Sequence, residues 1–164
     1  MPLPTSTVED AYRHYFPIIR EKCRRMLLDA HEAEDAAQET FIRFWKERIH
    51  ERGELDGVRW IYRVATHASV DRLRRRRVRE SYAAHNASHA TQEPSVGADL
   101  RQIVERLSAQ LPQRTLEVGL LSRCDRLTQK EISEVAGISE RHVRRLLEQF
   151  EVTVTALFLE GHDV

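Results

Sequence analysis

The sequence predicts an all-α protein: two small helical domains joined by a flexible linker, the second containing a helix-turn-helix. Apolar residues recur at the 3.6-residue spacing of amphipathic helices on both sides of a central stretch that lacks any periodicity. Gly and Pro number only 6 and 5 in 164 residues, and helices of ordinary length need few of either. The contents of hydrophobic and charged residues, 41% and 32%, are typical of a folded chain rather than a disordered one.

The first domain is expected to span residues 8–80. A helix carrying Tyr12, Phe16 and Ile19 is expected to end near Leu28, and a second to run over about residues 33–48. The apolar stripe of this second helix is expected to hold Ala37, Phe41, Phe44 and Trp45. A third helix is expected to begin near Val58 after a glycine-containing turn, and a final helical stretch to carry Val70 and Leu73 into a run of arginines.

Residues 81–98 (SYAAHNASHATQEPSVGA) have the small, polar composition of a linker, with Pro94 and Gly97 and no helical period. The second domain is expected over residues 99–158. It opens with one short amphipathic helix around Leu107, which Leu111-Pro112 ends, and a second helix follows that reaches Leu121.

The helix-turn-helix signal begins at Thr128-Gln129-Lys130-Glu131, a capping box that marks a helix start. Gly137 permits the unusual backbone angles of a turn, and Ser139 is placed to cap the second helix. The residues expected on the outward face of that helix are Glu140, Arg141, Arg144 and Arg145. Arginine there can bridge phosphates or read guanine edges in the major groove. The alternative is an αα-corner in a helical bundle with a solvated charged face.

The arginine run RLRRRRVR (residues 72–79) contains six arginines and no acid, although the whole chain has 26 basic and 26 acidic residues. It continues a helix that bears Trp60, Tyr62, Arg63 and His67. Aromatic residues interleaved with cations suit unpaired DNA, because bases stack on flat surfaces and phosphates need counter-charge. The alternatives are that Trp60 and Tyr62 are ordinary core residues and that the run is a solvated face.

Several function classes are disfavoured. Cys23 and Cys124 have no CxxC partner, which fits neither a zinc site nor a disulfide framework and agrees with a reducing cytoplasm. His85 and His89 lie in the expected linker without a neighbouring ligand, so we expect no metal and no cofactor. No nucleophile motif or phosphate-binding glycine loop is present, so we expect no enzyme. Without a signal peptide or membrane span, a cytoplasmic protein with no membrane insertion is expected.

Four segments together resemble the extracytoplasmic-function (ECF, group 4) sigma factors of the sigma-70 family. AEDAAQETFIRFW (residues 33–45) resembles their polymerase-binding helix, and WIYRVATHASVDRLRRRR (residues 60–77) their promoter-melting segment. LPQRTLEVGLL (residues 111–121) and LTQKEISEVAGISERHVRRLL (residues 127–147) resemble their second domain. The order and spacing of the segments also match, which makes the resemblance more specific than any one motif.

The resemblance implies three groups of contact residues. Those implied to dock on the largest polymerase subunit are Asp35, Gln38, Glu39 and Trp45. Those implied to capture the opened non-template strand at the minus-ten element are Arg63, His67, Asp71, Arg72 and Arg74, to which the stacking argument adds Trp60. Those implied to contact the minus-thirty-five element are Ser139, Glu140, Arg141, Arg144 and Arg145.

Two departures from the family pattern carry expectations of their own. Thr66-His67 stands where the family often has Arg-Asn, which affects the choice of minus-ten base. Gly119 stands where a larger apolar residue is usual, which predicts looser packing there.

The partners implied are core RNA polymerase, promoter DNA (duplex and melted non-template strand) and an anti-sigma factor. The main alternative is a stand-alone helix-turn-helix regulator whose N-terminal part dimerises or senses. Such a regulator has no need of the residue 33–45 motif beside an aromatic-arginine helix. A nucleic-acid-processing enzyme and a polymerase-binding protein without promoter recognition are the remaining alternatives.

Overall fold

The computed structural model describes residues 8–86 and 96–160, with side chains described over residues 8–83 and 102–160. Its elements are α1 (Val8–Leu27), α2 (Ala30–Lys46), the 3-10 helix η1 (Ile49–Arg52), α3 (Glu54–Asn86), α4 (Val96–Gln110), α5 (Gln113–Arg123), α6 (Gln129–Ala136) and α7 (Glu140–Glu160). The described residues contain no β-strand. The all-α prediction is confirmed.

The turn between α1 and α2 is set by two adjacent residues. Leu28 adopts a left-handed backbone with φ of 54°, which ends α1. Asp29 then caps α2, its side chain accepting the backbone N–H of Glu32 at 2.9 Å. The cap starts α2 at Ala30, a little before the start that apolar spacing predicts.

One of the four residues predicted for the buried stripe of α2 lies outside it. Phe41 and Phe44 are 4% and 3% exposed and lie in the core formed by α1, α2 and α3. Trp45 is 60% exposed. Its assignment to the apolar stripe was wrong, because the next residue along a helix is rotated by about 100° around the axis.

The third helix is longer than predicted and continuous. α3 joins the two expected helical stretches without a break, starts at Glu54 and runs to Asn86. Helix therefore covers residues 81–86, and α4 covers 96–98, of the segment expected to be a linker, while residues 87–95 lie outside the described residues. Long charged side chains such as arginine form helices well, so helix can outlast the apolar period.

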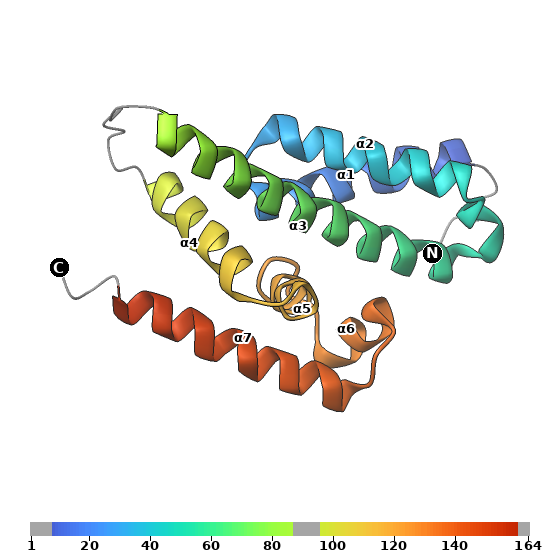
Figure 1. The fold of residues 1–164 in the computed structure, drawn as a ribbon. Coiled ribbons are helices and arrows are strands. Elements are labelled where there is room, and N and C mark those ends of the chain that lie inside the picture. Colours follow the sequence, from blue (N-terminus) through green and yellow to red (C-terminus); the bar gives the residue numbers. More distant parts are fainter. Residues whose placement is uncertain (1–7, 87–95, 161–164) are drawn as a thin grey trace.

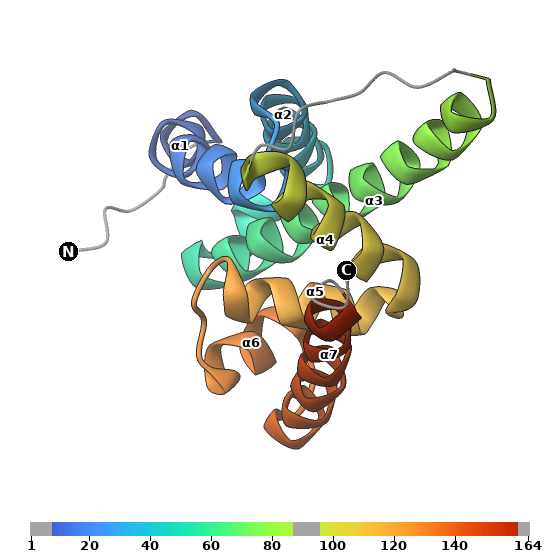
Figure 2. The same ribbon diagram turned by 90° about the vertical axis from the view of Figure 1, so that its left-hand side faces the viewer.

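The helices pack on both sides of α3. α1 and α2 lie against one side, and α4, α5 and α6 lie against the other, with α7 beyond them (Figures 1 and 2). One apolar cluster joins α1, α2 and α3. A second joins Met26 of α1 and Val70 of α3 to Leu107, Leu116 and Phe150 of the C-terminal helices. The N-terminal half of the chain (α1 to α3) and the C-terminal half (α4 to α7) thus share a core.

Close packing of α5 on α7 depends on Gly119. A Cβ atom added at this position would overlap the ring of Phe150, which is itself 3% exposed. The looser packing expected there was wrong, because the phenyl ring fills the space that a side chain at position 119 would occupy.

Candidate polymerase and nucleic-acid interface

One exposed face of α2 holds all four residues expected to dock on polymerase. Asp35, Gln38 and Glu39 are exposed along with Trp45, at helical spacings that place them on neighbouring turns. Ile42 lies between them and is 52% exposed, so this face is part apolar and part acidic. Sequence reasoning missed Ile42, although its spacing of three residues from both Glu39 and Trp45 was a usable signal.

The residues expected to capture the minus-ten strand divide by environment. Arg63 and Asp71 are exposed on α3. The Arg72 guanidinium pairs with Glu39 of α2 at 2.8 Å, which connects the two proposed contact faces. Arg74 donates to the Gln113 side chain and to the Leu111 carbonyl oxygen, both at 3.3 Å. Gln113 and Leu111 both belong to the C-terminal half of the chain.

His67 is also bound by the C-terminal half. Its Nδ1 lies 2.6 Å from a carboxylate oxygen of Glu117 on α5. A carboxylate only accepts, so Nδ1 carries the proton; the Gln113 amide, 3.0 Å from the same nitrogen, then donates to Glu117 at 2.9 Å. The hydrogen bond to Glu117 raises the pKa of His67, against partial desolvation and Arg63, which lower it.

Trp60 does not offer its ring to a ligand in this structure. It is 7% exposed, with its ring 6.0 Å from that of Phe44 and 5.7 Å from the Arg43 guanidinium. The expectation that it stacks on DNA bases is corrected to a core role, because α3 turns this position toward α2. Tyr62 is half-buried and packs between the first-domain cluster and the α5–α7 cluster.

The arginines of the run at residues 72–79 lie in different environments. Arg76 is 3% exposed, and both its terminal nitrogens donate to the Leu27 carbonyl oxygen at 3.1 Å, which satisfies the end of α1. Its neighbours face an open groove of about 720 Å³ between α2 and α3. The groove is lined by Glu32, Asp35, Arg72, Arg74, Arg75, Val78 and Arg79. Four arginines against two carboxylates make it suited to an anionic ligand.

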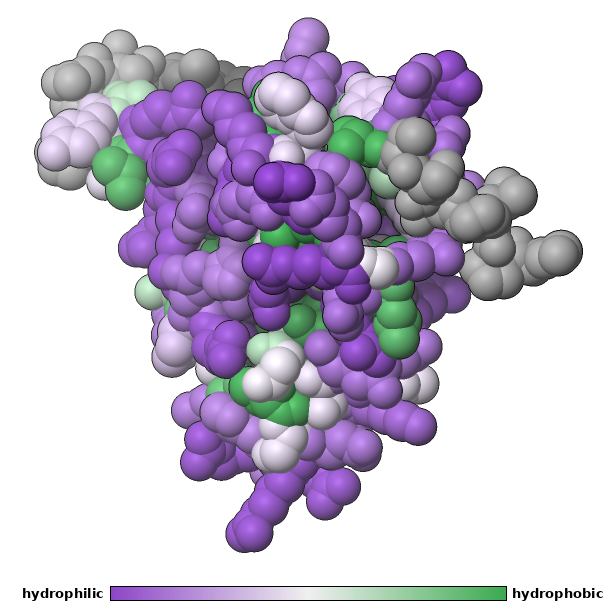
Figure 3. Space-filling model, turned by 90° about the vertical axis from the view of Figure 1, so that its right-hand side faces the viewer, coloured by the Kyte–Doolittle hydropathy of each residue, from purple (hydrophilic) through white to green (hydrophobic). Residues whose placement is uncertain are grey.

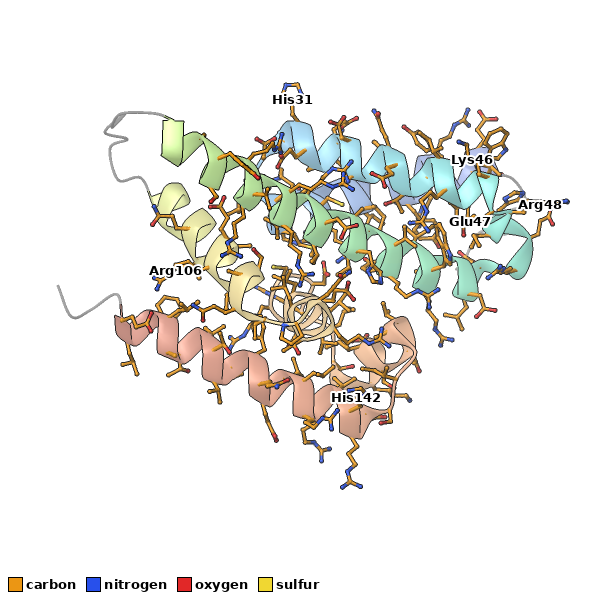
Figure 4. The ribbon with its side chains drawn as sticks, viewed as in Figure 1. His31, Lys46, Glu47, Arg48, Arg106 and His142 are labelled. Carbon is orange, nitrogen blue, oxygen red and sulfur yellow. The ribbon has the colours of Figure 1, made fainter. Side chains whose placement is uncertain are left out.

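The α6–α7 unit has the local geometry that its sequence predicts. The Thr128–Glu131 capping box is present in both directions, and Gly137 adopts a left-handed backbone with φ of 67°. The Ser139 hydroxyl accepts the backbone N–H of His142 at 3.2 Å at the start of α7. Figure 4 shows His142 on the end of α7 that lies beside α6, remote from α1 and α2. The four side chains exposed there are Glu140, Arg141, Arg144 and Arg145.

The described residues hold neither a candidate metal cluster nor a membrane-spanning helix. The face drawn in Figure 3 is mostly hydrophilic, with small separate apolar patches. Among the residues with described side chains, no three His, Cys, Asp or Glu gather where they could hold a metal ion. The pair His85 and His89 falls outside those side chains. Within the described ranges, no helix has the length and apolar character needed to cross a membrane.

Comparisons with known proteins identify the family of the chain. Residues 11–79 match the family Sigma-70 region 2. The ECF RNA polymerase sigma factor SigM of Bacillus subtilis (strain 168) is 25% identical over 159 residues, which cover 94% of this chain and 97% of SigM. SigW of the same organism, also an ECF RNA polymerase sigma factor, is 28% identical over 148 residues, 79% of each chain. The chain is an ECF sigma factor of the sigma-70 family.

The fold of this sigma factor has a solved counterpart. CnrH, in a structure of its complex with the cytosolic domain of CnrY, aligns with a TM-score of 0.61 over 98% of this chain and 94% of that chain. The two sequences are 14% identical, so the likeness concerns the fold alone. The match to region 2 places α1, α2 and most of α3 in that family.

Proposed function

We propose that this sigma factor binds core RNA polymerase and directs promoter-specific transcription initiation, including capture of the minus-ten strand. The observation that carries the proposal is similarity to SigM and SigW, which extends over most of the length of each chain. Both of these relatives are RNA polymerase sigma factors. Acting on polymerase places it in the cytoplasm. It performs no covalent chemistry of its own.

The proposed division of labour follows the two halves of the chain. Residues 8–80 act as region 2, residues 99–158 act as region 4, and residues 81–98 connect them. Two short elements read by tethered modules give more selectivity than either alone, because the second contact is effectively intramolecular.

The proposed polymerase contact is the exposed face of α2. Its carboxylates, Asp35 and Glu39, suit a basic partner surface, and Trp45 has the size and exposure of an interface anchor. Ile42 is added to this contact. The mixture of an apolar centre with acidic neighbours is typical of a protein interface rather than of a solvated helix face.

The proposed minus-ten contact lies on α3 and in the arginine groove. Arg63, His67, Arg72 and Arg74 supply counter-charge to a single strand, with Asp71 as an acceptor for base amino groups. A surface that binds separated bases and not the duplex shifts the equilibrium toward melted DNA. His67 in place of the family's usual asparagine bears on which base is preferred.

The proposed minus-thirty-five contact is the start of α7. Arg141, Arg144 and Arg145 are exposed, and Ser139 and Glu140 lie at the helix end that a recognition helix presents to the major groove. The charge of the three arginines supplies affinity for the duplex, and base contacts supply selectivity.

An anti-sigma factor is proposed as the third partner, after core polymerase and promoter DNA. The support is that CnrH has been solved with the cytosolic domain of CnrY bound. Inhibition of transcription by a co-purifying protein, relieved by its removal, would identify it.

The test of the proposed function is run-off transcription with purified core polymerase and a pooled promoter library. The expected result is selective start sites with shared upstream elements, together with loss of core capture in Asp35→Lys and Gln38→Ala variants. The control is substitution of Glu9, an exposed residue in the first turn of α1 that lies outside the α2 face. Dimeric operator binding without polymerase capture would favour the stand-alone regulator instead.

A further inference from the structure

An exposed stripe of α3 continues beyond the residues proposed for the minus-ten strand. Its side chains follow one another at spacings of four, three and four residues, which is the spacing of one helix face: Asp71, Arg75, Val78 and Tyr82. All four are exposed. With a rise of about 1.5 Å per residue, Tyr82 lies about 16 Å beyond Asp71, a length of about five base pairs of duplex DNA. The proposed minus-ten face therefore extends along α3 without interruption.

The end of α3 projects past its neighbours. Figure 2 shows its last turns extending beyond α1 and α2. Glu32 of α2 reaches this part of the helix, where it pairs with Arg76 and, at 3.4 Å, with Arg79. The stripe lies beside these pairs and not beneath them, since Val78 is 55% exposed and Tyr82 is 72% exposed. A projecting helix of this kind has the size that the major groove of duplex DNA admits.

The side chains of the stripe suit a groove-reading helix better than a solvated helix end. Among the described side chains, the Arg75 guanidinium and the Tyr82 hydroxyl make no hydrogen bond or ion pair with a neighbour. A solvated helix face carries polar side chains, whereas Val78 and Tyr82 stand one turn apart on this one. In the major groove, arginine pairs with guanine through two hydrogen bonds and an aliphatic side chain contacts the thymine methyl. Tyrosine is a phosphate donor.

The direction of the chain indicates which base pairs the stripe meets. α3 leads into the C-terminal half, whose α7 is proposed to contact the minus-thirty-five element. The end of α3 therefore points upstream of the minus-ten element, toward base pairs that stay paired when that element melts. Val78 offers no flat surface on which an unpaired base could stack, which also favours a duplex ligand.

We propose that Arg75, Val78 and Tyr82 read a third promoter element, the duplex directly upstream of the minus-ten element, from the major groove. Arg75 pairs with the O6 and N7 atoms of a guanine, Val78 contacts a thymine methyl, and the Tyr82 hydroxyl donates to a phosphate that fixes the position of the helix. This element rests on the proposed function and adds a further source of promoter selectivity to it.

The test is run-off transcription by holoenzyme, assembled from purified core polymerase and the full chain, on a pool of variants of one promoter. The pool keeps the minus-ten and minus-thirty-five elements of a promoter found by run-off. It randomises the duplex directly upstream of the minus-ten element over about six base pairs, slightly more than the stripe can reach. Sequencing of the transcribed templates gives the base preference at each position.

The variants are Arg75→Ala, Val78→Ser and Tyr82→Phe, and the matched control is Arg77→Ala. Arg77 belongs to the same arginine run, so its substitution removes the same charge from the same helix. It lies on another face of α3, where it lines a separate groove with residues of α4. Circular dichroism and capture of core polymerase establish that every chain folds and assembles.

Wild type is expected to enrich a guanine at one randomised position by at least about fivefold, the lower end of what a bidentate arginine contact discriminates, and a thymine at a second position to a smaller extent. Arg75→Ala is expected to abolish the guanine preference and keep the thymine preference, and Val78→Ser to do the reverse. Tyr82→Phe is expected to lower transcription from all templates alike. Arg77→Ala is expected to keep both preferences.

Absence of any enrichment by wild type, or a guanine preference that survives Arg75→Ala, would overturn the third element. Equal effects of Arg75→Ala and Arg77→Ala would overturn it as well, because the total charge of the run would then matter and not the exposed stripe. In these cases selective start sites from the other two elements would leave the sigma function standing. Failure of wild type to give any selective start site would refute the sigma function and, with it, the third element.

Discussion

The two tryptophans have opposite environments and should respond oppositely to truncation. Trp60 is 7% exposed and packs on Phe44, whereas Trp45 on the preceding helix is 60% exposed. Trp60→Ala removes a buried ring, which is expected to lower the free energy of unfolding by about 3–5 kcal/mol. Trp45→Ala changes a surface position and is expected to change it by no more than about 0.5 kcal/mol.

Urea unfolding followed by far-UV circular dichroism measures both values, and capture of core polymerase supplies the second readout. Trp45→Ala is expected to weaken core binding by tenfold or more, about 1.4 kcal/mol, because a large exposed ring is a typical interface anchor. Trp60→Phe, which keeps an aromatic core, is expected to retain core capture and strand binding. Equal loss of stability in the two alanine variants, or strand binding abolished by Trp60→Phe in a stably folded chain, would refute this reasoning.

Three further predictions concern packing, pH and promoter contact. Gly119→Ala is expected to destabilise the chain by about 1–3 kcal/mol in thermal unfolding, because the added Cβ overlaps the ring of Phe150. Adding Phe150→Leu to the Gly119→Ala variant is expected to recover part of that loss. A Gly119→Ala variant as stable as wild type would contradict the packing. Because Glu117 raises the pKa of His67, the stability contributed by protonated His67 is full below about pH 6.5 and is lost as pH rises through the raised value. The thermal unfolding midpoint is therefore expected to fall slightly over that pH range, and Glu117→Gln is expected to abolish the fall. If Arg144 reads a base, Arg144→Ala is expected to weaken duplex binding by about 1–3 kcal/mol and to relax promoter choice. If Arg144 contacts only a phosphate, the substitution is expected to lower the salt dependence of duplex binding by about one counterion without changing promoter choice.

Local chemistry explains why much of the fold follows from the sequence. The Thr128–Glu131 capping box and Gly137 are signals carried by adjacent residues, and the structure forms both as predicted. The amphipathic periods likewise locate the helices. The full length of α3 was missed because apolar spacing ends near Leu73 while arginines continue the helix.

Long-range pairing was beyond sequence reasoning. Nothing local to Lys22 indicates Asp125, and nothing distinguishes Arg76, buried against Leu27, from its exposed neighbours in the run. Which of these charges pair depends on how α3 packs against both halves of the chain. Trp60 and Trp45 differ for a similar reason, since helix phase relative to partner helices decides which ring is buried.

Promoter opening is the step on which the proposed function depends. Permanganate reactivity of thymines across a promoter selected by run-off measures that step directly. Reactive thymines are expected at the minus-ten element only when core polymerase and this chain are both present, and His67→Ala and Arg74→Ala are expected to reduce their reactivity. Unreactive thymines with both proteins bound, or reactivity unchanged in those variants, would contradict it.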